Sequence, residues 1–299
     1  MPRSVVTLWV GIVCMGSFSA EAVAQVDSTL ARVRATNAIG EQGARTMLVS
    51  PGFSERAHEI DRLLDEADRF LSAELDFETD FALAVLDEEA WAEVWPFPYG
   101  VPYVSLAEPW VVVMPASPEA GVLMAPIEAI LGTERARTAI DNIGFHEVGH
   151  IYGSALYPSL SPDGEPAVRW LDEFLASYLA YGFLEAAAPD RAAVWRSFID
   201  GVLAGPRPRF TGLEDFDAEY YGYLGSADGA LNYNWYQAAF LDLVVRIHAD
   251  EGMGFMRSLH ATVESFDGES IDSSAARGWL DALTPHFQEW LEGLESPSP

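Results

Sequence analysis

The chain has 299 residues, of which 49% are hydrophobic and 12% aromatic, so it can bury a full core and is not an intrinsically disordered protein. It carries 46 acidic and 17 basic residues, for a formal net charge of −29, and every basic residue is arginine. A chain this acidic does not bind nucleic acid or an anionic membrane surface through charge. Composition leaves two origins open, a salt-tolerant surface hydrated by carboxylates or a codon bias toward arginine with ordinary acidity.

Residues 1–24 have the layout of a secretory signal peptide. Arg3 precedes an apolar run over residues 5–15, and small residues lead to Ala24. The run has about eleven residues whereas a spanning helix needs about twenty, which favours cleavage after Ala24 over an uncleaved anchor. We therefore expect a secreted or periplasmic protein with no membrane span in the mature chain. Cys14 is the only cysteine, so the mature chain would contain no disulfide.

The pattern is weak from residue 25 to residue 50, where we expect an extended lead-in with room for one short helix. A helix is predicted over Ser54–Leu75, because its apolar residues form one stripe against a charged face and Ser54 can cap it. Two apolar, β-rich runs follow at Phe81–Leu86 and at residues 110–114, and they predict strands.

The most specific pattern is His146-Glu147-Val148-Gly149-His150, of the form HExxH. Residues 134–145 have apolar side chains at helical spacing, with Thr133 as a candidate cap, so the motif is expected on a helix. Two histidines four residues apart then share one face and can hold a zinc ion, while Glu147 points toward the open position of the ion. The ion needs a further protein ligand.

A second segment can supply that ligand. Twenty-two residues separate His150 from Glu173, which lies in the run Trp170-Leu171-Asp172-Glu173-Phe174-Leu175-Ala176-Ser177-Tyr178. The large apolar residues of this run repeat at helical spacing, so a loop and a return helix would bring Glu173 to the metal. Asp172, Asp163 and Glu165 are alternative ligands. Leu156 stands where the metzincin pattern requires a histidine, which excludes that pattern.

The two motifs together resemble the gluzincins, zinc metallopeptidases of the thermolysin and aminopeptidase type, whose third ligand often lies in a segment W-L-x-E-x-x-A-x-Y. The resemblance covers about residues 81 to 259. It implies that His146, His150 and Glu173 bind zinc, and that Glu147 is the base that assists attack of a zinc-bound water on a peptide bond. Asp and Phe flank Glu173 where aminopeptidases often have Asn and Gly, which leaves the substrate class open.

The same resemblance implies positions for substrate binding and for the oxyanion donor. In gluzincins a strand upstream of HExxH pairs with an extended peptide, so Trp110 and Val112 are expected to bind substrate; an interior strand is the alternative. In the aminopeptidase branch a tyrosine that opens a helix stabilises the oxyanion, which implies Tyr236, with Tyr233 as its rival. The segment around Glu108 faintly resembles one that holds the amino terminus of a substrate.

Further helices are predicted at residues 191–203, 231–249 and 275–291, because apolar side chains repeat there at helical spacing. Residues 210–230 are aromatic and rich in turn-forming residues, and we expect a loop that could roof a cleft. Their acidic residues lack EF-hand spacing, which argues against calcium.

The predicted fold class is α+β, with a small strand-bearing lobe that ends on the HExxH helix and a helical lobe beyond it, and with the active site between them. The predicted units are a signal peptide at 1–24, a lead-in at 25–50 and a catalytic domain at 51–295, divided into lobes at 51–155 and 156–295. The predicted function is a secreted zinc metallopeptidase acting on a peptide or protein. The alternatives are a zinc hydrolase of a non-peptide bond and a peptidase-like binding protein.

Overall fold

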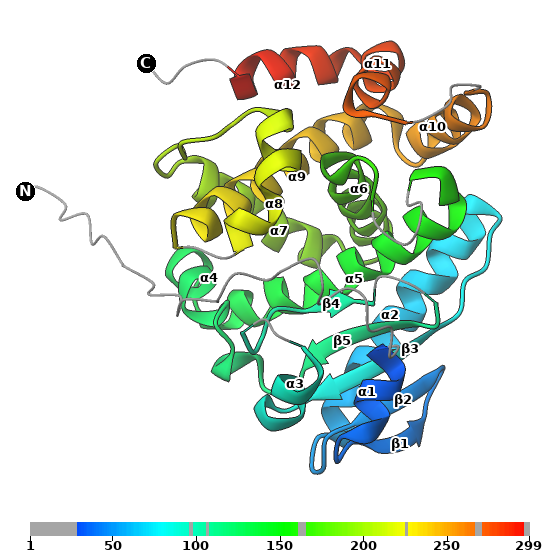
Figure 1. The fold of residues 1–299 in the computed structure, drawn as a ribbon, viewed down its shortest axis with the longest axis vertical. Helices are drawn as coiled ribbons and strands as arrows, with labels where there is room; N and C mark the ends of the chain where they lie inside the picture. Colours follow the sequence, from blue (N-terminus) through cyan, green and yellow to red (C-terminus); the bar gives the residue numbers. More distant parts are fainter. Residues whose placement is uncertain are drawn as a thin grey trace, which may run out of the picture.

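The computed structural model describes residues 29–95, 98–105, 108–160, 166–224, 227–266 and 271–295. The fold is α+β, as predicted: a five-stranded sheet occupies one half of the molecule, and the later part of the chain forms a helical half (Figure 1). Within these ranges no helix is long and apolar enough to cross a membrane. The predicted signal peptide lies outside the described residues.

The sheet is mixed, with three parallel strands in the middle and one antiparallel strand at each edge. Its strand order is β1-β2-β3-β5-β4. The strands are β1 (Ile39–Gln42), β2 (Thr46–Val49), β3 (Phe81–Leu86), β4 (Tyr103–Val104) and β5 (Trp110–Pro115). The helices of this half are α1 (Thr29–Ala35), α2 (Ser54–Leu75), α3 (Glu88–Val94), α4 (Met124–Leu131) and α5 (Thr133–Leu156), with a short 3-10 helix η2 (Pro118–Ala120).

Helices cover both faces of the sheet, which explains why β3 is apolar without interruption. Leu83 and Val85 of β3 face the main core, which α2 and α5 also line. Ala82 and Ala84 face the opposite way, into a smaller core closed by α1 and α3 (Figure 1). The strand thus alternates between two apolar environments rather than between core and solvent.

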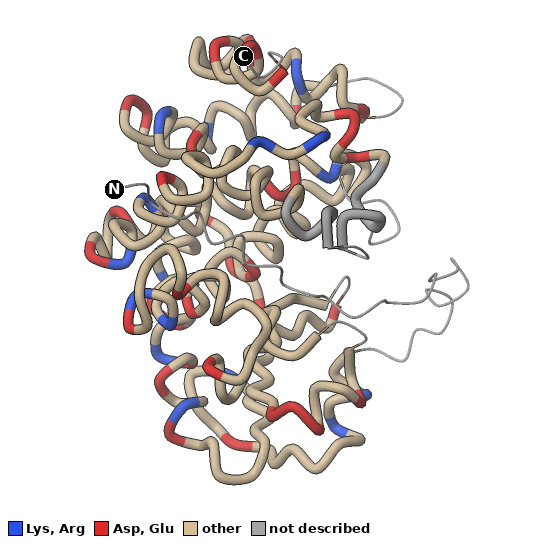
Figure 2. Tube along the Cα trace, turned by 90° about the vertical axis from the view of Figure 1, so that its left-hand side faces the viewer, with Lys and Arg blue, Asp and Glu red and all other residues tan. Residues whose placement is uncertain are grey.

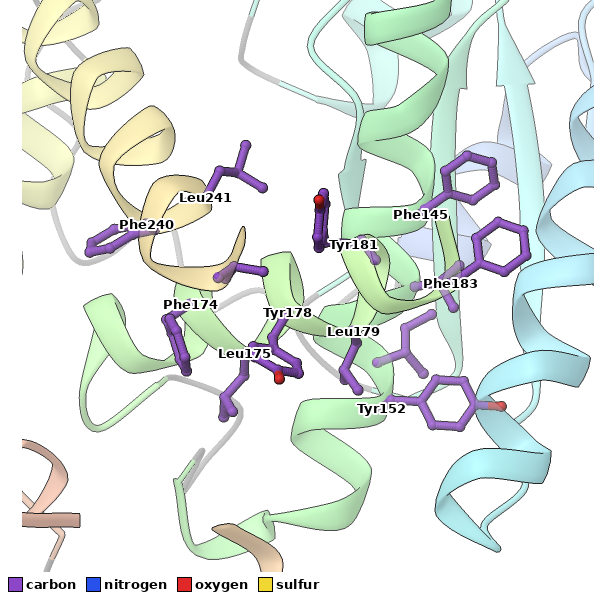
Figure 3. Close-up of a cluster of buried hydrophobic side chains, with 14 of the residues drawn as sticks. Phe145, Tyr152, Phe174, Leu175, Tyr178, Leu179, Tyr181, Phe183, Phe240 and Leu241 are labelled. Carbon is purple, nitrogen blue, oxygen red and sulfur yellow. The ribbon is translucent and has the colours of Figure 1, made fainter. Parts of the chain in front are cut away.

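The helical half packs onto the other side of α5. It consists of α6 (Arg169–Ala187), α7 (Pro189–Leu203), α8 (Leu213–Leu224), α9 (Ala227–Glu251), α10 (Gly254–Glu264), α11 (Ser273–Leu283) and α12 (Pro285–Glu295), preceded by a 3-10 helix η3 (Pro158–Leu160). Figure 3 shows the junction, where Phe145 of α5 lies against Phe183 of α6 at a ring-centroid distance of 5.0 Å. Phe174 and Tyr178 of α6 continue this cluster toward α9, so one apolar core joins the two halves (Figure 3).

Several predicted elements agree with the structure. The Ser54–Leu75 helix and the Phe81–Leu86 strand have the predicted bounds, and the helix with HExxH is present. Neither predicted serine or threonine cap forms: α2 has Phe53 and α5 has Gly132 at the cap position, and no side chain caps either helix. Ser54 instead bonds Glu41 of β1.

Other elements differ from the prediction. The lead-in contains one short helix, α1, for which the prediction left room, but its extended part forms two strands, β1 and β2, of the same sheet as β3. Most of the predicted loop at 210–230 is helical, in α8 and the start of α9, and Phe216 of α8 packs against Tyr236 of α9. The prediction that the segment roofs a cleft falls on side chains outside the described residues. The predicted helix at 275–291 is two helices, since Pro285 cannot continue α11 and begins α12.

Acidic residues lie along elements of both halves and are not gathered on one face (Figure 2). Some of the arginines are buried against them. Arg45 has a side chain that is 6% exposed and contacts Asp61 of α2 at 3.1 Å, which ties the β1–β2 hairpin to that helix. Arg56 of α2 pairs with Asp141 of α5. Removing one partner of such a pair would leave a buried charge unpaired, so the first contact holds the hairpin to α2 and the second holds α5 to α2.

Helices α5 and α6 touch backbone to backbone at Gly149, inside the HExxH motif. A Cβ atom added at Gly149 would lie 2.4 Å from the carbonyl oxygen of Ala176 and 2.8 Å from its Cα. Ala176 is three residues beyond Glu173 on α6. The close crossing therefore depends on glycine at this position and sets how near Glu173 comes to the two histidines.

We predict that Gly149→Ala lowers the free energy of unfolding by about 1–3 kcal/mol, the usual range for overpacking a close contact. Gly153→Ala is the matched control, because it lies one turn further along α5 with no atom within 4 Å of its added Cβ. The control should be neutral or more stable by about 0.5–1 kcal/mol, since alanine favours a helix over glycine. Urea unfolding of both variants measures the difference, and equal stabilities would contradict the close crossing.

Candidate metal centre

The HExxH motif lies in the middle of α5, where the helix is enclosed between the sheet and α6. His146 is 8% exposed and Glu147 is 7% exposed, while the side chain of His150 is 15% exposed. Small residues such as Gly144 and Gly149 let neighbouring elements approach this part of the helix. Buried polar side chains need hydrogen-bond or ion-pair partners, and for the two histidines of this motif α6 supplies them.

His146, His150 and Glu173 converge, as the sequence predicted. The His146 Nε2 atom lies 3.1 Å from Glu173 Oε2 and 3.0 Å from His150 Nε2. The third pair, His150 Nε2 and Glu173 Oε2, is 3.7 Å apart. Within the described part of the chain, these three side chains form the one group of His, Cys, Asp or Glu residues close enough to hold a metal ion.

This arrangement fits zinc. Zinc bound tetrahedrally at about 2.0–2.2 Å separates its ligand atoms by about 3.3–3.6 Å, and the three distances here bracket that range. The donor set of two imidazoles and one carboxylate is also one that catalytic zinc sites use, with a fourth position left for water or substrate.

Each histidine has a partner on its other ring nitrogen, and both partners come from α6. His150 Nδ1 lies 3.0 Å from Asp172 Oδ2, and His146 Nδ1 lies 3.3 Å from Ser177 Oγ. Such contacts fix the ring orientation and leave both Nε2 atoms for the metal. Asp172, an alternative ligand in the sequence, is therefore placed as a partner of His150 rather than in the ligand group. Ser177 was not predicted, although it lies one turn from Glu173.

Glu147 is next to this group without belonging to it. Burial raises the pKa of Glu147 to about 8, and the negative charge of Glu173 adds to the shift, against the opposing effects of His150 and the backbone N–H of Val104. A carboxyl group with a raised pKa can exchange a proton near neutral pH, which is what a general base requires. The position and the pKa of Glu147 both suit that role.

The electrostatics around His150 favour a cation. Burial lowers the pKa of His150, but Asp172 and Glu173 outweigh burial and raise it to about 10. Burial raises the pKa of Glu173, but a hydrogen bond from His146 and the charge of His150 outweigh it and lower it to about 2. For His146, burial and the charge of His150 lower the pKa. The carboxylates of Asp172 and Glu173 thus stabilise positive charge at the histidines, and a bound divalent cation can supply that charge in place of a proton.

The structure contradicts the prediction that Tyr236 supplies the oxyanion donor. Tyr236 is 0% exposed and its hydroxyl donates to the carbonyl oxygen of Gly212 at 2.6 Å, with its ring packed against Phe216. Tyr233, the rival, lies at the site instead, and its hydroxyl donates to Glu173 Oε1 at 3.2 Å. The two tyrosines are three residues apart, so the assumed helix register was wrong by almost one turn.

The structure also contradicts the position of the substrate edge. Trp110 and Val112 belong to β5, which pairs with β3 on one side and with β4 on the other, so Val112 is 0% exposed on an interior strand. Among the described strands, β4 is the edge strand on this side. Ser105, just after β4, donates its N–H to the carbonyl oxygen of Val111 in β5. Successive residues of a strand direct their N–H groups to opposite sides, so the N–H of Val104 points away from β5 and bonds Glu147.

The remaining candidates are not part of the ligand group or lie outside the described residues. Asp163 and Glu165 are outside the described residues. Glu108 is exposed and lines a depression of about 460 Å³ together with half-buried Trp110 and with Ser154 of α5. This depression lies at the C-terminal end of α5.

The fold brings His146, His150 and Glu173 together into one group that could hold a metal ion. No protein-family model matches the chain, and no curated protein matches it in sequence. Among solved structures, it is similar to an M1 zinc metallopeptidase from Deinococcus radiodurans, in a mutant form bound to a Tyr-Ser-Ala substrate, with a TM-score of 0.44 and 16% identity. The match covers 87% of this chain and 52% of that one, so the chain spans about half the length of that structure.

We predict that the purified protein binds about one zinc ion per chain, and that His150→Ala and Glu173→Ala lose it, because each removes one of three ligands. Metal analysis after dialysis against a weak chelator measures the stoichiometry. Glu165→Ala is the control and should keep the ion. Stoichiometric zinc in Glu173→Ala, together with its loss in Glu165→Ala, would move the third ligand to Glu165.

Proposed function

We propose that the chain is a secreted zinc-dependent metallopeptidase. The observation that supports this most is the convergence of His146, His150 and Glu173 at mutual distances of 3.0–3.7 Å, with Glu147 buried beside them. This set contains three metal ligands and a base, which is the minimum for metal-assisted hydrolysis. The signal-peptide pattern of residues 1–24 supports export.

The residues of this chain then have distinct tasks. Zinc supplies Lewis acidity, which lowers the pKa of a water molecule and polarises a carbonyl group. Glu147 accepts the proton of the attacking water and returns it to the leaving amine. Its enclosed position excludes bulk solvent, which strengthens its electrostatic interactions with the reacting groups. Asp172 and Ser177 keep the two imidazoles oriented during the reaction.

We place the substrate along β4 rather than β5. An extended peptide can add to a sheet edge through main-chain hydrogen bonds, and among the described strands β4 is the edge strand whose backbone contacts Glu147. Because β4 has two residues, it offers few pairing positions, and side-chain contacts would have to supply the rest of the affinity.

Glu147→Gln should keep zinc but lower kcat/KM for peptides by about 10²–10⁴-fold, because the amide has the same shape and cannot accept the proton. Cleavage of a quenched fluorescent peptide library, with zinc content measured on the same sample, tests this. Turnover near that of the parent would contradict the role of Glu147 as base.

The same assay separates the alternatives when esters and epoxides are included. Hydrolysis of these compounds without peptide cleavage would support a zinc hydrolase of a non-peptide bond. Stoichiometric zinc with no turnover of any substrate would support a binding protein.

Tyr233 is our candidate for the oxyanion donor: its hydroxyl donates to Glu173 Oε1 and would have to turn from that bond to reach an oxyanion. Tyr233→Phe should then lower kcat by about 10²–10³-fold with little change in KM. Tyr236→Phe is the matched control: it removes a core hydrogen bond to Gly212, so it should lower stability by about 1 kcal/mol and leave kcat unchanged. Steady-state kinetics and thermal unfolding of both variants test the pair. The reverse pattern would restore Tyr236 as the donor.

A further inference from the structure

Helix α9 holds both carboxylate oxygens of Glu173. Tyr233 donates its hydroxyl to Oε1 at 3.2 Å, and Gln237 donates from Nε2 to Oε2 at 2.8 Å. The two side chains are four residues apart, so they share one face of α9 and meet the carboxylate from the same side. The third ligand is therefore held by a helix other than its own.

The two donors are not equivalent. Gln237 bonds Oε2, the oxygen that lies 3.1 Å from His146 Nε2 and 3.7 Å from His150 Nε2 and would bind the metal. Tyr233 bonds the other oxygen. A carboxylate rotates broadly about its last torsion, so a donor on the ligand oxygen fixes which oxygen faces the imidazoles.

The chemistry of glutamine suits this position. An ionised carboxylate only accepts hydrogen bonds, so it must face the amide nitrogen of Gln237 and not the amide oxygen. Because the amide is neutral, it orients the ligand without adding a positive charge that would repel a bound cation, as lysine or arginine would.

We propose that Gln237 is a positioning residue of the metal centre, which holds Glu173 Oε2 in place for zinc. The inference rests on the zinc site of the proposed function but not on its peptidase activity. The competing explanation is that Gln237 only packs α9 against α6. The two explanations differ in whether zinc affinity or the stability of the metal-free protein depends on the amide.

Gln237→Met tests the proposal, because methionine keeps the length of the side chain and removes the donor. We expect the zinc dissociation constant, measured by competition with a chromophoric chelator, to rise about 10–100-fold, as for loss of other groups that orient metal ligands. The melting temperature in excess chelator should fall no further than in Tyr236→Phe, which also loses one core hydrogen bond. The visible absorption of the cobalt-substituted protein should shift, since it reports the ligand geometry that mere packing would leave alone.

Two further variants distinguish a failure of the proposed role of Gln237 from a failure of the zinc site itself. Asp172→Asn should weaken zinc binding to a similar extent through His150. His150→Ala should abolish tight binding, and if it does not, the zinc site of the proposed function is itself wrong. An unchanged dissociation constant and cobalt spectrum in Gln237→Met, beside a weakened Asp172→Asn, would overturn the role of Gln237 alone. If Gln237→Met and Gln237→Leu both fail to fold without metal, Gln237 is a packing residue, and the proposal is wrong.

Discussion

The candidate site depends on one contact, the backbone crossing of α5 and α6 at Gly149. Two imidazoles on α5 cannot hold zinc alone, and Glu173 reaches them only because the two helices approach until Gly149 faces the main chain of Ala176. The sheet packs against α5 on one side of the crossing, and the aromatic cluster of the helical half packs against α6 on the other. The fold around this crossing therefore acts as a support that keeps two helices at one distance.

A second layer of contacts determines how the ligands are oriented. Four side chains contact the ligands without binding the metal themselves. Asp172, Ser177 and Tyr233 each contact a ligand atom that would not face the metal. Gln237 differs, because it donates to the oxygen that would bind the metal. Two of the four come from α6 and two from α9. The metal site is thus built from three helices although its ligands lie on two, and this explains why α9 is an integral part of the centre.

The sequence predicts the parts of this site that local periodicity and spacing encode. Helical spacing places His146, Glu147 and His150 on α5, and a second amphipathic run after a loop brings Glu173 to them. Spacing could not decide between Tyr233 and Tyr236, because the start of α9 lies in an aromatic segment whose composition resembles a loop. It could not reveal that β5 is an interior strand either, since the strand that covers it, β4, has two residues and no periodic pattern. Sheet order and outer contacts depend on tertiary packing.

Helix α6 carries Asp172, Glu173 and Ser177 within two turns, and each contacts a different ring nitrogen of the two histidines. A residue inserted or deleted between the start of α6 and Glu173 would rotate everything beyond it by about 100° and shift it by about 1.5 Å. Glu173 would then leave the histidines, and Ser177 would leave His146 in the same step. A centre of this kind tolerates exchanges of residue type at many surrounding positions, but it fixes the length of the segment that carries it, so variation in length among natural versions of this chain should fall in the connections between helices.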